Sequence, residues 1–589
     1  MQLDQYEQQD TFGEPCPLPV NANCLDLLWV YTVKTDGTLK SRCVCNGRPS
    51  NKNTAIFGYS FAKSLDQVGA RIFWAVAAAK NLIVRGADAS NAFAEARAPK
   101  IPLFVKIDQP FRDWWYHKYP NKHLPDNFVL PVKKALQGHP ESPRSWATLI
   151  NKILTEKLHF VPTTHEPCLY RGEFHGKEVF FLRQVDDFAV ACVDEDTAVE
   201  VIKAIDKEMT IDIKDLGRLQ RYNGVDISQG QDFIKISNET YLDKIFEGHP
   251  WMVTENNYIS NKPLPMPSDN KYIQRLENAT KLDSEEDKRT LQHKMGFNYR
   301  QAVGELIYAM VTCRPDISFP LIKLSQYSSN PSEEHYLAIK DIFYYLKATK
   351  SDGIYYWRPT PNLNLPKLPM PTSTPSTYSP EPSSRADTPL DLIGSVDADW
   401  AGDSTHRRSI TGIILRLAGG TVLYKTKFQD TIAMSSTEAE FSAACEAAKS
   451  ILYIRSILDE LGVQQYHATT LFIDNNGALM MGNAQQPTRR TRHMDIKKFV
   501  IVDWIEQDLL TLKYINTADN YSHAMTKALG RIQHYRHFDY VMGRDKPNYQ
   551  KYDQNETNVR TLFTVLNQHV CHKASNMGGV IHVKGVLPH

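Results

Sequence analysis

The sequence predicts a mixed α/β protein made of two folded parts joined by a linker. Strand-like runs alternate with helical ones on both sides of residues 358–391. Residues 358–391 are rich in Pro, Ser and Thr and almost without aromatic side chains. Such a composition cannot bury a hydrophobic core, and it favours an extended, semi-rigid backbone. We therefore expect this segment to separate the two folded parts.

The part upstream of the linker is expected to open with a β-hairpin. Leu28–Val33 and Arg42–Cys45 are strand-like and flank TDGT, a hairpin signal. Helical spacing from about Ser64 to Lys80 leads into a short buried strand that ends at Asp88. Further helices are expected at Ser145–Leu158, Val303–Thr312, Ile317–Tyr327 and Glu334–Thr349.

The part downstream of the linker is expected to combine short strands with one long helix. The predicted strands are Leu392–Val396, Gly412–Leu417, Thr421–Tyr424 and Thr470–Ile473. The long helix is predicted between the third and fourth strands, at Ser436–Leu461.

Composition excludes several classes of protein. The net charge of the 589 residues is +1, so any nucleic-acid binding must come from local basic surfaces. The nine cysteines are scattered without a CxxC pair, which argues against a disulfide framework and a zinc ribbon. The longest apolar run, Ile72–Ala79, falls far short of the about 20 residues that cross a bilayer. The first residues are polar and acidic, so we expect a soluble protein of a reducing compartment.

Two adjacent acids stand between two apolar strand candidates. Val179–Gln184 and Phe188–Val193 flank Asp186 and Asp187, and a third acid, Asp88, ends its own strand. Like charges this close repel one another, and a bound divalent cation resolves the repulsion. Oxygen-only ligands select a hard ion such as Mg²⁺, and three acids are what two ions need for in-line displacement. Taken alone, the acidic pair has another explanation, an exposed hairpin turn.

The chain from about Trp29 to Leu529 resembles the reverse transcriptase and ribonuclease H segment of copia-type LTR retrotransposon polyproteins. The resemblance rests on sequence blocks that occur in the order known for that family. In the first part the blocks are WVYTVKTDGTLKSRCVCNG, DASNAF, KKALQGHPESPRSW, QVDD, KDLGRLQRYNGVDI, AVGELIY, TCRPDISF and HYLAIKDIFYYLKAT. Beyond the linker they are SVDADWAGD, SSTEAEF, FIDNNGAL and TRHMDI.

The resemblance implies a right-hand polymerase followed by a ribonuclease H-like mixed-sheet domain. The corresponding divisions are 1–235 for fingers and palm, 236–357 for a helical thumb or connection, and 358–391 for the linker. The ribonuclease H-like domain would occupy 392–531, and 532–589 would be a tail of unknown role.

The family's polymerase residues carry over by position. Asp88, Asp186 and Asp187 match the catalytic, metal-binding trio, and Phe93 matches the aromatic gate beneath the nucleotide sugar. Arg42, with Lys34 or Lys40 nearby, matches the basic fingers residues that neutralise a triphosphate. An ordinary core Phe and solvated lysines are the alternatives. Two positions depart from the family's pattern: Gln184 replaces a Tyr expected at the primer end, and Glu141 replaces a Gln expected beside the nucleotide.

The resemblance also implies a second catalytic and metal-binding set, Asp397, Glu438 and Asp474, which matches the first three acids of a ribonuclease H site. Where relatives place the fourth acid, this chain has His523, and imidazole is a poor ligand for Mg²⁺. Asp519 lies four residues earlier and would compensate in part if both stood on one helix. We therefore expect ribonuclease H activity to be weakened or lost. The basic segment 489–498 is expected to contact hybrid phosphates, with a solvated face as the alternative.

The function implied by the resemblance is RNA-directed DNA synthesis with two Mg²⁺ or Mn²⁺ ions in each active site. The expected partners are an RNA template, a DNA primer, an RNA/DNA hybrid and deoxynucleoside triphosphates, with no membrane, and the oligomeric state is left open. We expect a cytoplasmic location, with virus-like particles and the nucleus as further compartments. The alternative function is a decayed or co-opted remnant that binds RNA or hybrid without catalysis.

Overall fold

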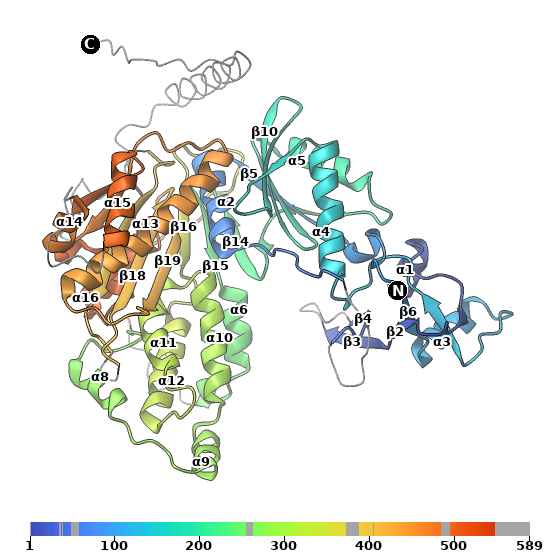
Figure 1. Cartoon of the computed structure of the whole chain (residues 1–589), viewed down its shortest axis with the longest axis horizontal. Helices are drawn as coiled ribbons and strands as arrows, with labels where there is room; N and C mark the ends of the chain where they lie inside the picture. The colour runs from blue at the N-terminus through green and yellow to red at the C-terminus, as the bar shows by residue number, and fades with distance from the viewer. Residues whose placement is uncertain are drawn as a thin grey trace.

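The computed structural model describes residues 2–33, 37, 39–48, 58–254, 263–372, 388–403, 406–483 and 495–547. It consists of five β-sheets with helices packed on and between them, which confirms the predicted mixed α/β class. The amino-terminal sheets lie at one end of the molecule, the six-stranded sheet lies in the middle, and the last sheet lies at the other end above a group of helices (Figure 1).

The amino-terminal region holds the predicted hairpin and a small sheet. Strands β3 (Leu27–Val33) and β4 (Leu39–Cys45) pair antiparallel, as expected. Beside the hairpin lie α1 (Gln2–Gln8) and α3 (Gln109–Lys118). The small sheet has the order β1-β7-β6-β2 and consists of Cys16–Pro17, Phe128–Pro131, Leu103–Lys106 and Asn23–Leu25.

The six-stranded sheet carries the first acidic cluster. Its order is β12-β5-β11-β10-β9-β8, formed by Lys214–Arg218, Ile83–Asp88, Asp187–Cys192, Lys177–Gln184, Leu169–Phe174 and Val161–Pro162. Its central strands β10 and β11 are buried on both faces along their apolar stretches. Alternate residues of β10 and β11 face α2 (Gln67–Ala79), and those between them face α4 (Ser142–Lys152) and α5 (Glu195–Asp206). A π-helical turn, Ile153–Lys157, ends the predicted helix of residues 145–158.

A four-stranded sheet and a group of helices follow. The sheet, β13-β14-β15-β16, is formed by Arg221–Tyr222, Val225–Gln229, Phe233–Ser237 and Gly353–Trp357. Between its third and fourth strands the helices are α6 (Glu239–Glu247), α7 (Trp251–Thr254), α8 (Asn270–Glu277), α9 (Glu285–Met295), α10 (Tyr299–Thr312), α11 (Ser318–Ser325) and α12 (Glu333–Ala348). Most of these helices pack around a second hydrophobic core, to which Ile410 and Tyr535 from the carboxyl-terminal part of the chain also belong.

The last sheet has the mixed topology predicted for residues 392–531. Its order is β19-β18-β17-β20-β21, formed by Gly420–Phe428, Ile410–Leu417, Ile393–Asp399, Thr469–Ile473 and Leu510–Tyr514. The first three strands pair antiparallel, and β17, β20 and β21 pair parallel. Helices α13 (Ser436–Glu460), α14 (Asn476–Asn483) and α15 (Asp495–Glu506) accompany it. We call this part the nuclease-like domain, after the ribonuclease H-like domain that the resemblance implies for residues 392–531.

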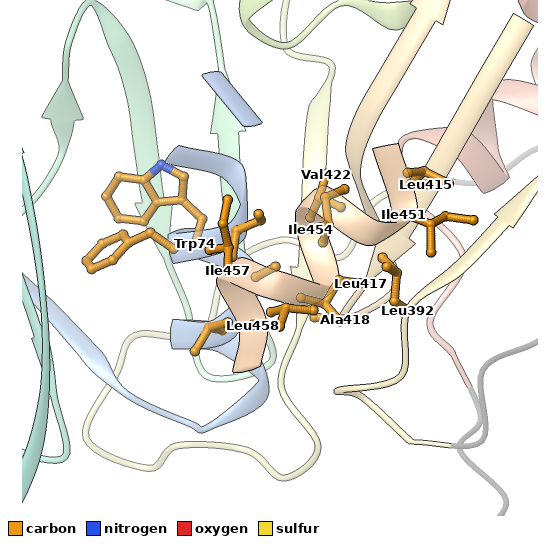
Figure 2. Close-up of a cluster of buried hydrophobic side chains, with 14 of the residues drawn as sticks. Trp74, Leu392, Leu415, Leu417, Ala418, Val422, Ile451, Ile454, Ile457 and Leu458 are labelled. Carbon is orange, nitrogen blue, oxygen red and sulfur yellow. The ribbon is translucent and has the colours of Figure 1, made fainter. Parts of the chain in front are cut away.

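The nuclease-like domain shares one hydrophobic core with the part of the chain that carries the six-stranded sheet, which we call the polymerase part after the resemblance described above. Trp74 of α2, Ile454, Ile457 and Leu458 of α13, and Val422 of β19 belong to one buried cluster (Figure 2). Because one core serves both parts, the two parts pack against each other. The predicted linker therefore divides them in the sequence but does not hold them apart. The linker itself begins as packed chain.

A buried arginine crosses the junction between the two parts. Arg71 of α2 donates to the carbonyl of Thr312 at 3.1 Å and to the hydroxyl of Tyr424 at 2.9 Å. At the start of the predicted linker, buried Arg358 donates to the carbonyl of Leu82 at 2.9 Å. These side chains connect elements that are hundreds of residues apart in the sequence.

The predicted tail starts inside an ordered helix. Helix α16 (Arg531–Val541) buries Phe538 against the nuclease-like sheet and its neighbours. Beyond it, the carbonyl of Met542 accepts a hydrogen bond from the backbone N–H of Tyr355 at 2.8 Å, on the open edge of β16. The packed chain therefore continues past the boundary predicted at residue 531. Within the described part of the chain, no helix is both long and apolar enough to cross a membrane.

Candidate active site

Three acids meet at one edge of the six-stranded sheet. Asp186 stands in the tight turn between β10 and β11, and Asp187 is the first residue of β11. Asp187 pairs across the sheet with Asp88 of β5. The backbone N–H of Ala89 donates to the carbonyl oxygen of Asp186 at 2.9 Å, which ties the end of β5 to the turn. The structure thus brings together the trio predicted from the sequence.

The surroundings of this trio oppose the ionised form of two of the acids. Burial raises the pKa of Asp187 to about 6, and the charges of Asp186 and Asp88 add to the effect. Burial and Asp88 also raise the pKa of Asp186, while Arg42 and Lys40 act in the opposite direction. A divalent cation would relieve the repulsion between these carboxylates. Their oxygen-only ligand set fits Mg²⁺ or Mn²⁺.

A pocket of about 400 Å³ opens beside these acids. Arg42 and Lys40 of β4, Phe93 beyond β5, Asp88 and Asp186 all line it. The other lining residues are Gln2, Gln5, Leu39, Ser41, Ala89, Ser90, Asn91, Ala92, Gln137 and Val185. The predicted basic residues and the predicted aromatic gate therefore share one cavity with two of the acids. Lys34, the other predicted basic residue, lies outside the described residues.

The turn that carries Asp186 has a strained backbone and is held by a hydrogen bond from a buried tryptophan. Val185 has a φ of 56°, a left-handed conformation that is unfavourable for a β-branched residue. Its carbonyl accepts a hydrogen bond from Nε1 of Trp146 at 2.6 Å. Trp146 is buried on α4, and its ring stacks on Phe188 with the ring centres 6.4 Å apart. Trp146 is therefore a positioning residue for the acidic turn.

Two residues predicted to contact substrate instead bind the protein's own backbone. Oε1 of Gln184 accepts a hydrogen bond from the N–H of Leu65 at 2.9 Å, just ahead of α2. Glu141 is buried, and its carboxylate accepts from the N–H groups of Gly58 at 2.6 Å and Lys100 at 3.5 Å. Neither side chain is among the residues lining the pocket. The substrate contacts predicted for Gln184 and Glu141 are therefore corrected to structural roles.

A second cluster lies in the nuclease-like domain, where β17 and β20 run parallel. Asp397 belongs to β17 and Asp474 follows β20 directly. Nε2 of His523 lies 3.3 Å from Oδ1 of Asp397 and 3.0 Å from Oδ2 of Asp474. The hydroxyl of Thr526 donates to the other oxygen of Asp397. The imidazole therefore stands between two of the predicted metal-binding carboxylates.

His523 and its partners stabilise one another as an ion pair. Burial alone would lower the pKa of His523, but its hydrogen bonds to Asp397 and Asp474 outweigh burial and raise the pKa to about 9. Burial opposes ionisation of Asp397 too, and the hydrogen bond and charge of His523 overcome it and lower the pKa. A positively charged side chain thus compensates the two acids.

The third acid of this cluster is Glu440, so the prediction of Glu438 is wrong. Glu440 is 6% exposed, and its Oε2 has no hydrogen-bond partner among the described residues. Burial raises the pKa of Glu440 well above its usual range, and the charges of Asp397 and Asp474 add to this. Glu438 instead accepts a hydrogen bond from the N–H of Met434 at 2.8 Å, at the start of α13. Two residues along a helix turn a side chain by about 200°, to the opposite face.

Asp519 does not compensate for the missing fourth acid. It lies in a short 3₁₀ turn, and an extended residue, Asn520, separates it from the next turn, which contains His523. The carboxylate of Asp519 is buried and pairs with Arg536 of α16. The two residues therefore do not share a helical face, and the predicted compensation is wrong. The side chains of the predicted basic segment 489–498 lie outside the described residues.

Comparison with known proteins agrees with this arrangement. Residues 15–264 match the family described as reverse transcriptase (RNA-dependent DNA polymerase). The retrovirus-related Pol polyprotein from transposon TNT 1-94 of Nicotiana tabacum is 26% identical over 525 residues, which are 87% of this chain and 35% of that protein. The chain belongs to the copia-type retrotransposon polyproteins.

A further relative of this copia-type chain matches a similar share of the chain. The Pol polyprotein from transposon RE2 of Arabidopsis thaliana is 24% identical over 88% of this chain and 32% of that protein. The chain thus spans about a third of the length of these curated relatives. Among solved structures, the foamy viral protease-reverse transcriptase in complex with ds DNA has 11% identity and a TM-score of 0.42, and covers 87% of this chain and 68% of that chain.

Two of the functional residues in this copia-type chain were not predicted from the sequence. Glu440 could have been found from the helix itself, because it is in register with the buried residues Ala443, Ala444 and Ala447 of α13. Trp146 lies in a predicted block, but nothing in the local sequence shows that its ring nitrogen reaches the turn at Val185.

Proposed function

We propose that this chain is an RNA-directed DNA polymerase that uses two divalent metal ions for nucleotidyl transfer. The observation that carries the proposal is the meeting of Asp88, Asp186 and Asp187 at the ends of their strands, where two of these acids line the same pocket as Arg42. Acids alone would suit any metal-dependent hydrolysis. Acids that share a pocket with Arg42 and Lys40 suit a substrate that carries both a reacting centre and a polyphosphate.

Each residue of the site has a distinct task in this proposal. Asp88, Asp186 and Asp187 would hold Mg²⁺ or Mn²⁺, which when bound lowers the pKa of a primer 3′-hydroxyl and neutralises the leaving pyrophosphate. Arg42 and Lys40 bind the triphosphate of the incoming nucleotide. The ring of Phe93 bounds the sugar and leaves no room for a 2′-hydroxyl, so it favours deoxynucleotides. The proposed partners are an RNA template, a DNA primer and deoxynucleoside triphosphates.

Primer extension on an RNA template with Mg²⁺ or Mn²⁺ tests the polymerase. The wild-type chain is compared with Asp186→Asn, which removes a metal ligand while keeping the shape of the side chain. Asp196→Asn is the matched control, because Asp196 is exposed in the first turn of α5. We expect extension by the wild type and the control and none by Asp186→Asn. Equal extension by all three would end the polymerase proposal.

We also propose that ribonuclease H activity is weakened or lost. Asp397, Asp474 and Glu440 would hold a metal ion, and the unpartnered, buried Oε2 of Glu440 fits such a role. His523 stands within hydrogen-bond distance of two of these acids and brings no oxygen ligand. It competes with a cation for their negative charge.

Cleavage of the RNA strand of a labelled RNA/DNA hybrid tests this part of the proposal. His523→Asp should raise the cleavage rate by at least tenfold over the wild type. Adding Asp474→Asn to His523→Asp should remove the gain, which shows that the new activity uses the same site. A wild-type rate equal to that of His523→Asp would contradict the proposal.

A second candidate function is a non-catalytic remnant that binds RNA or hybrid. The imidazole within the nuclease-like site favours it, because it removes an acid from one of the two centres. The two candidates differ in one measurement: a remnant binds an RNA/DNA hybrid as tightly as an active polymerase but extends no primer with either metal.

A further inference from the structure

The polymerase pocket has a wall that lies outside the matched family region. The family match begins at residue 15, whereas α1 ends at Gln8. Gln2 and Gln5 of α1 nevertheless line the pocket together with Arg42, Phe93 and Asp186. Helix α1 is anchored there by Leu3 and Tyr6, which are buried in the core beneath the hairpin. The amino-terminal helix is therefore part of the pocket.

Gln2 bridges the two elements that carry the predicted nucleotide contacts. Its Oε1 accepts a hydrogen bond from the N–H of Cys43, the residue after Arg42 on β4. Its Nε2 donates to Oδ1 of Asn91 at 3.4 Å and to the hydroxyl of Tyr6 at 3.0 Å. The same hydroxyl donates to the carbonyl of Cys43 at 2.9 Å. One amide thus links the hairpin to the segment that follows Asp88.

Asn91 needs such support because its backbone is left-handed, with φ 52° and ψ 38°. It precedes the short 3₁₀ helix that contains Phe93, so its conformation sets where that ring stands. A second glutamine of the same segment, Gln9, accepts a hydrogen bond from Nδ2 of Asn91. Nε2 of Gln9 donates to Glu95 at 2.7 Å. The side-chain amide of Asn91 is therefore hydrogen-bonded through its oxygen to Gln2 of α1 and through its nitrogen to Gln9, the residue after α1.

We propose that α1, through Gln2 and its bridge to Asn91, positions Arg42 and Phe93 for deoxynucleotide selection. Gln2 touches both the strand that presents the triphosphate-binding Arg42 and the turn that presents the sugar-bounding Phe93. The bridge fixes the separation between those two contacts, and hence how closely a nucleotide sugar is confined. The inference rests on the proposed polymerase function. Gln2 and Asn91 are positioning residues in it.

The test uses the full chain with any affinity tag at the carboxyl terminus, so that α1 is unaltered. Steady-state extension by one nucleotide gives kcat and KM for a deoxynucleotide and for the matching ribonucleotide. The variants are Gln2→Ala, Asn91→Gly and the double variant, and Gln8→Ala is the control because Gln8 is exposed on the same helix. Glycine accepts the left-handed backbone of Asn91, so Asn91→Gly removes the amide without adding strain.

Gln2→Ala and Asn91→Gly should each raise the deoxynucleotide KM about tenfold and lower the preference over ribonucleotides, with kcat changed less than about twofold. Tenfold corresponds to about 1.4 kcal/mol, which is within the net contribution of the hydrogen bonds that each change removes. The double variant should match Asn91→Gly, because Asn91→Gly already breaks the bridge to Gln2. If Gln2→Ala behaves like Gln8→Ala, or if the two effects multiply, the inference is overturned.

A separate measurement distinguishes this outcome from failure of the proposed function. Deoxynucleotide affinity is measured on a complex with a chain-terminated primer, which cannot react. A wild-type chain that extends no ordinary primer contradicts the polymerase proposal. The inference about Gln2 then stands or falls on whether Gln2→Ala loses deoxynucleotide affinity relative to Gln8→Ala in that complex.

Discussion

Replacing Trp146 with Phe should slow DNA synthesis although the residue contacts no substrate. The change keeps most of the buried ring and removes the N–H that binds the carbonyl of Val185 at 2.6 Å. An unsatisfied buried carbonyl costs about 1–3 kcal/mol. The left-handed backbone of Val185 stores about 1–2 kcal/mol more, and such strain persists only where the surroundings enforce it. Without the hydrogen bond, the turn is expected to relax and to carry Asp186 away from Asp88.

The expected result is a fall in the single-turnover extension rate of about tenfold, which corresponds to about 1.4 kcal/mol in the barrier. The affinity for primer and template should stay within about twofold. Val185→Gly removes the strain, since glycine adopts this conformation freely. In that background Trp146→Phe should therefore cost at least about 1 kcal/mol less. A Trp146→Phe rate within twofold of wild type, or simple additivity with Val185→Gly, would refute this reasoning.

Three further predictions follow from the packing and the second site. In a His523→Asp background, a hybrid-cleavage assay should show no cleavage by Glu440→Gln. The Glu438→Gln variant should keep at least half of the cleavage rate, because only Glu440 lies beside the other two acids. Removal of residues 531–589 should lower the denaturation midpoint, whereas removal of residues 548–589 keeps every contact described above and should not. Burial raises the pKa of Asp341 to about 6, so Asp341→Asn should raise the free energy of unfolding by about 2 kcal/mol above pH 6. That gain should vanish below about pH 3, where the carboxyl is protonated in both the folded and the unfolded state.

Much of the polymerase site could be predicted because its chemistry is local in the sequence. Asp186 and Asp187 are adjacent between two apolar strands, and Asp88 ends a third strand, which pairs with β11 so that Asp88 lies opposite Asp187. The side chains of Gln184 and Glu141 could not be placed in this way. Their partners, the backbone amides of Leu65 and Gly58, are 119 and 83 residues away, and no periodicity in the sequence reports such contacts.

The errors in the nuclease-like domain have two different physical causes. Glu438 and Glu440 are both acidic and lie in one block, and only the orientation of α13 decides which of them faces the sheet. The role of Asp519 depended on one continuous helix, and Asn520 interrupts it. The division at the linker was misleading for a third reason. Composition shows where a chain cannot form a core, but it does not show whether the flanking parts share one.

Because α2 and α13 share one core, loss of the chemistry of the nuclease-like site and loss of the whole nuclease-like domain have different consequences for the polymerase part. Loss of an acid in the nuclease-like site leaves the surfaces that cover Trp74 and β16 intact, so the polymerase part keeps its packing. Deletion of the whole domain would expose those surfaces to water. If the proposed polymerase function is selected for, the domain would therefore be retained for its packing even without hydrolysis. The presence of the domain does not show that it has ribonuclease H activity.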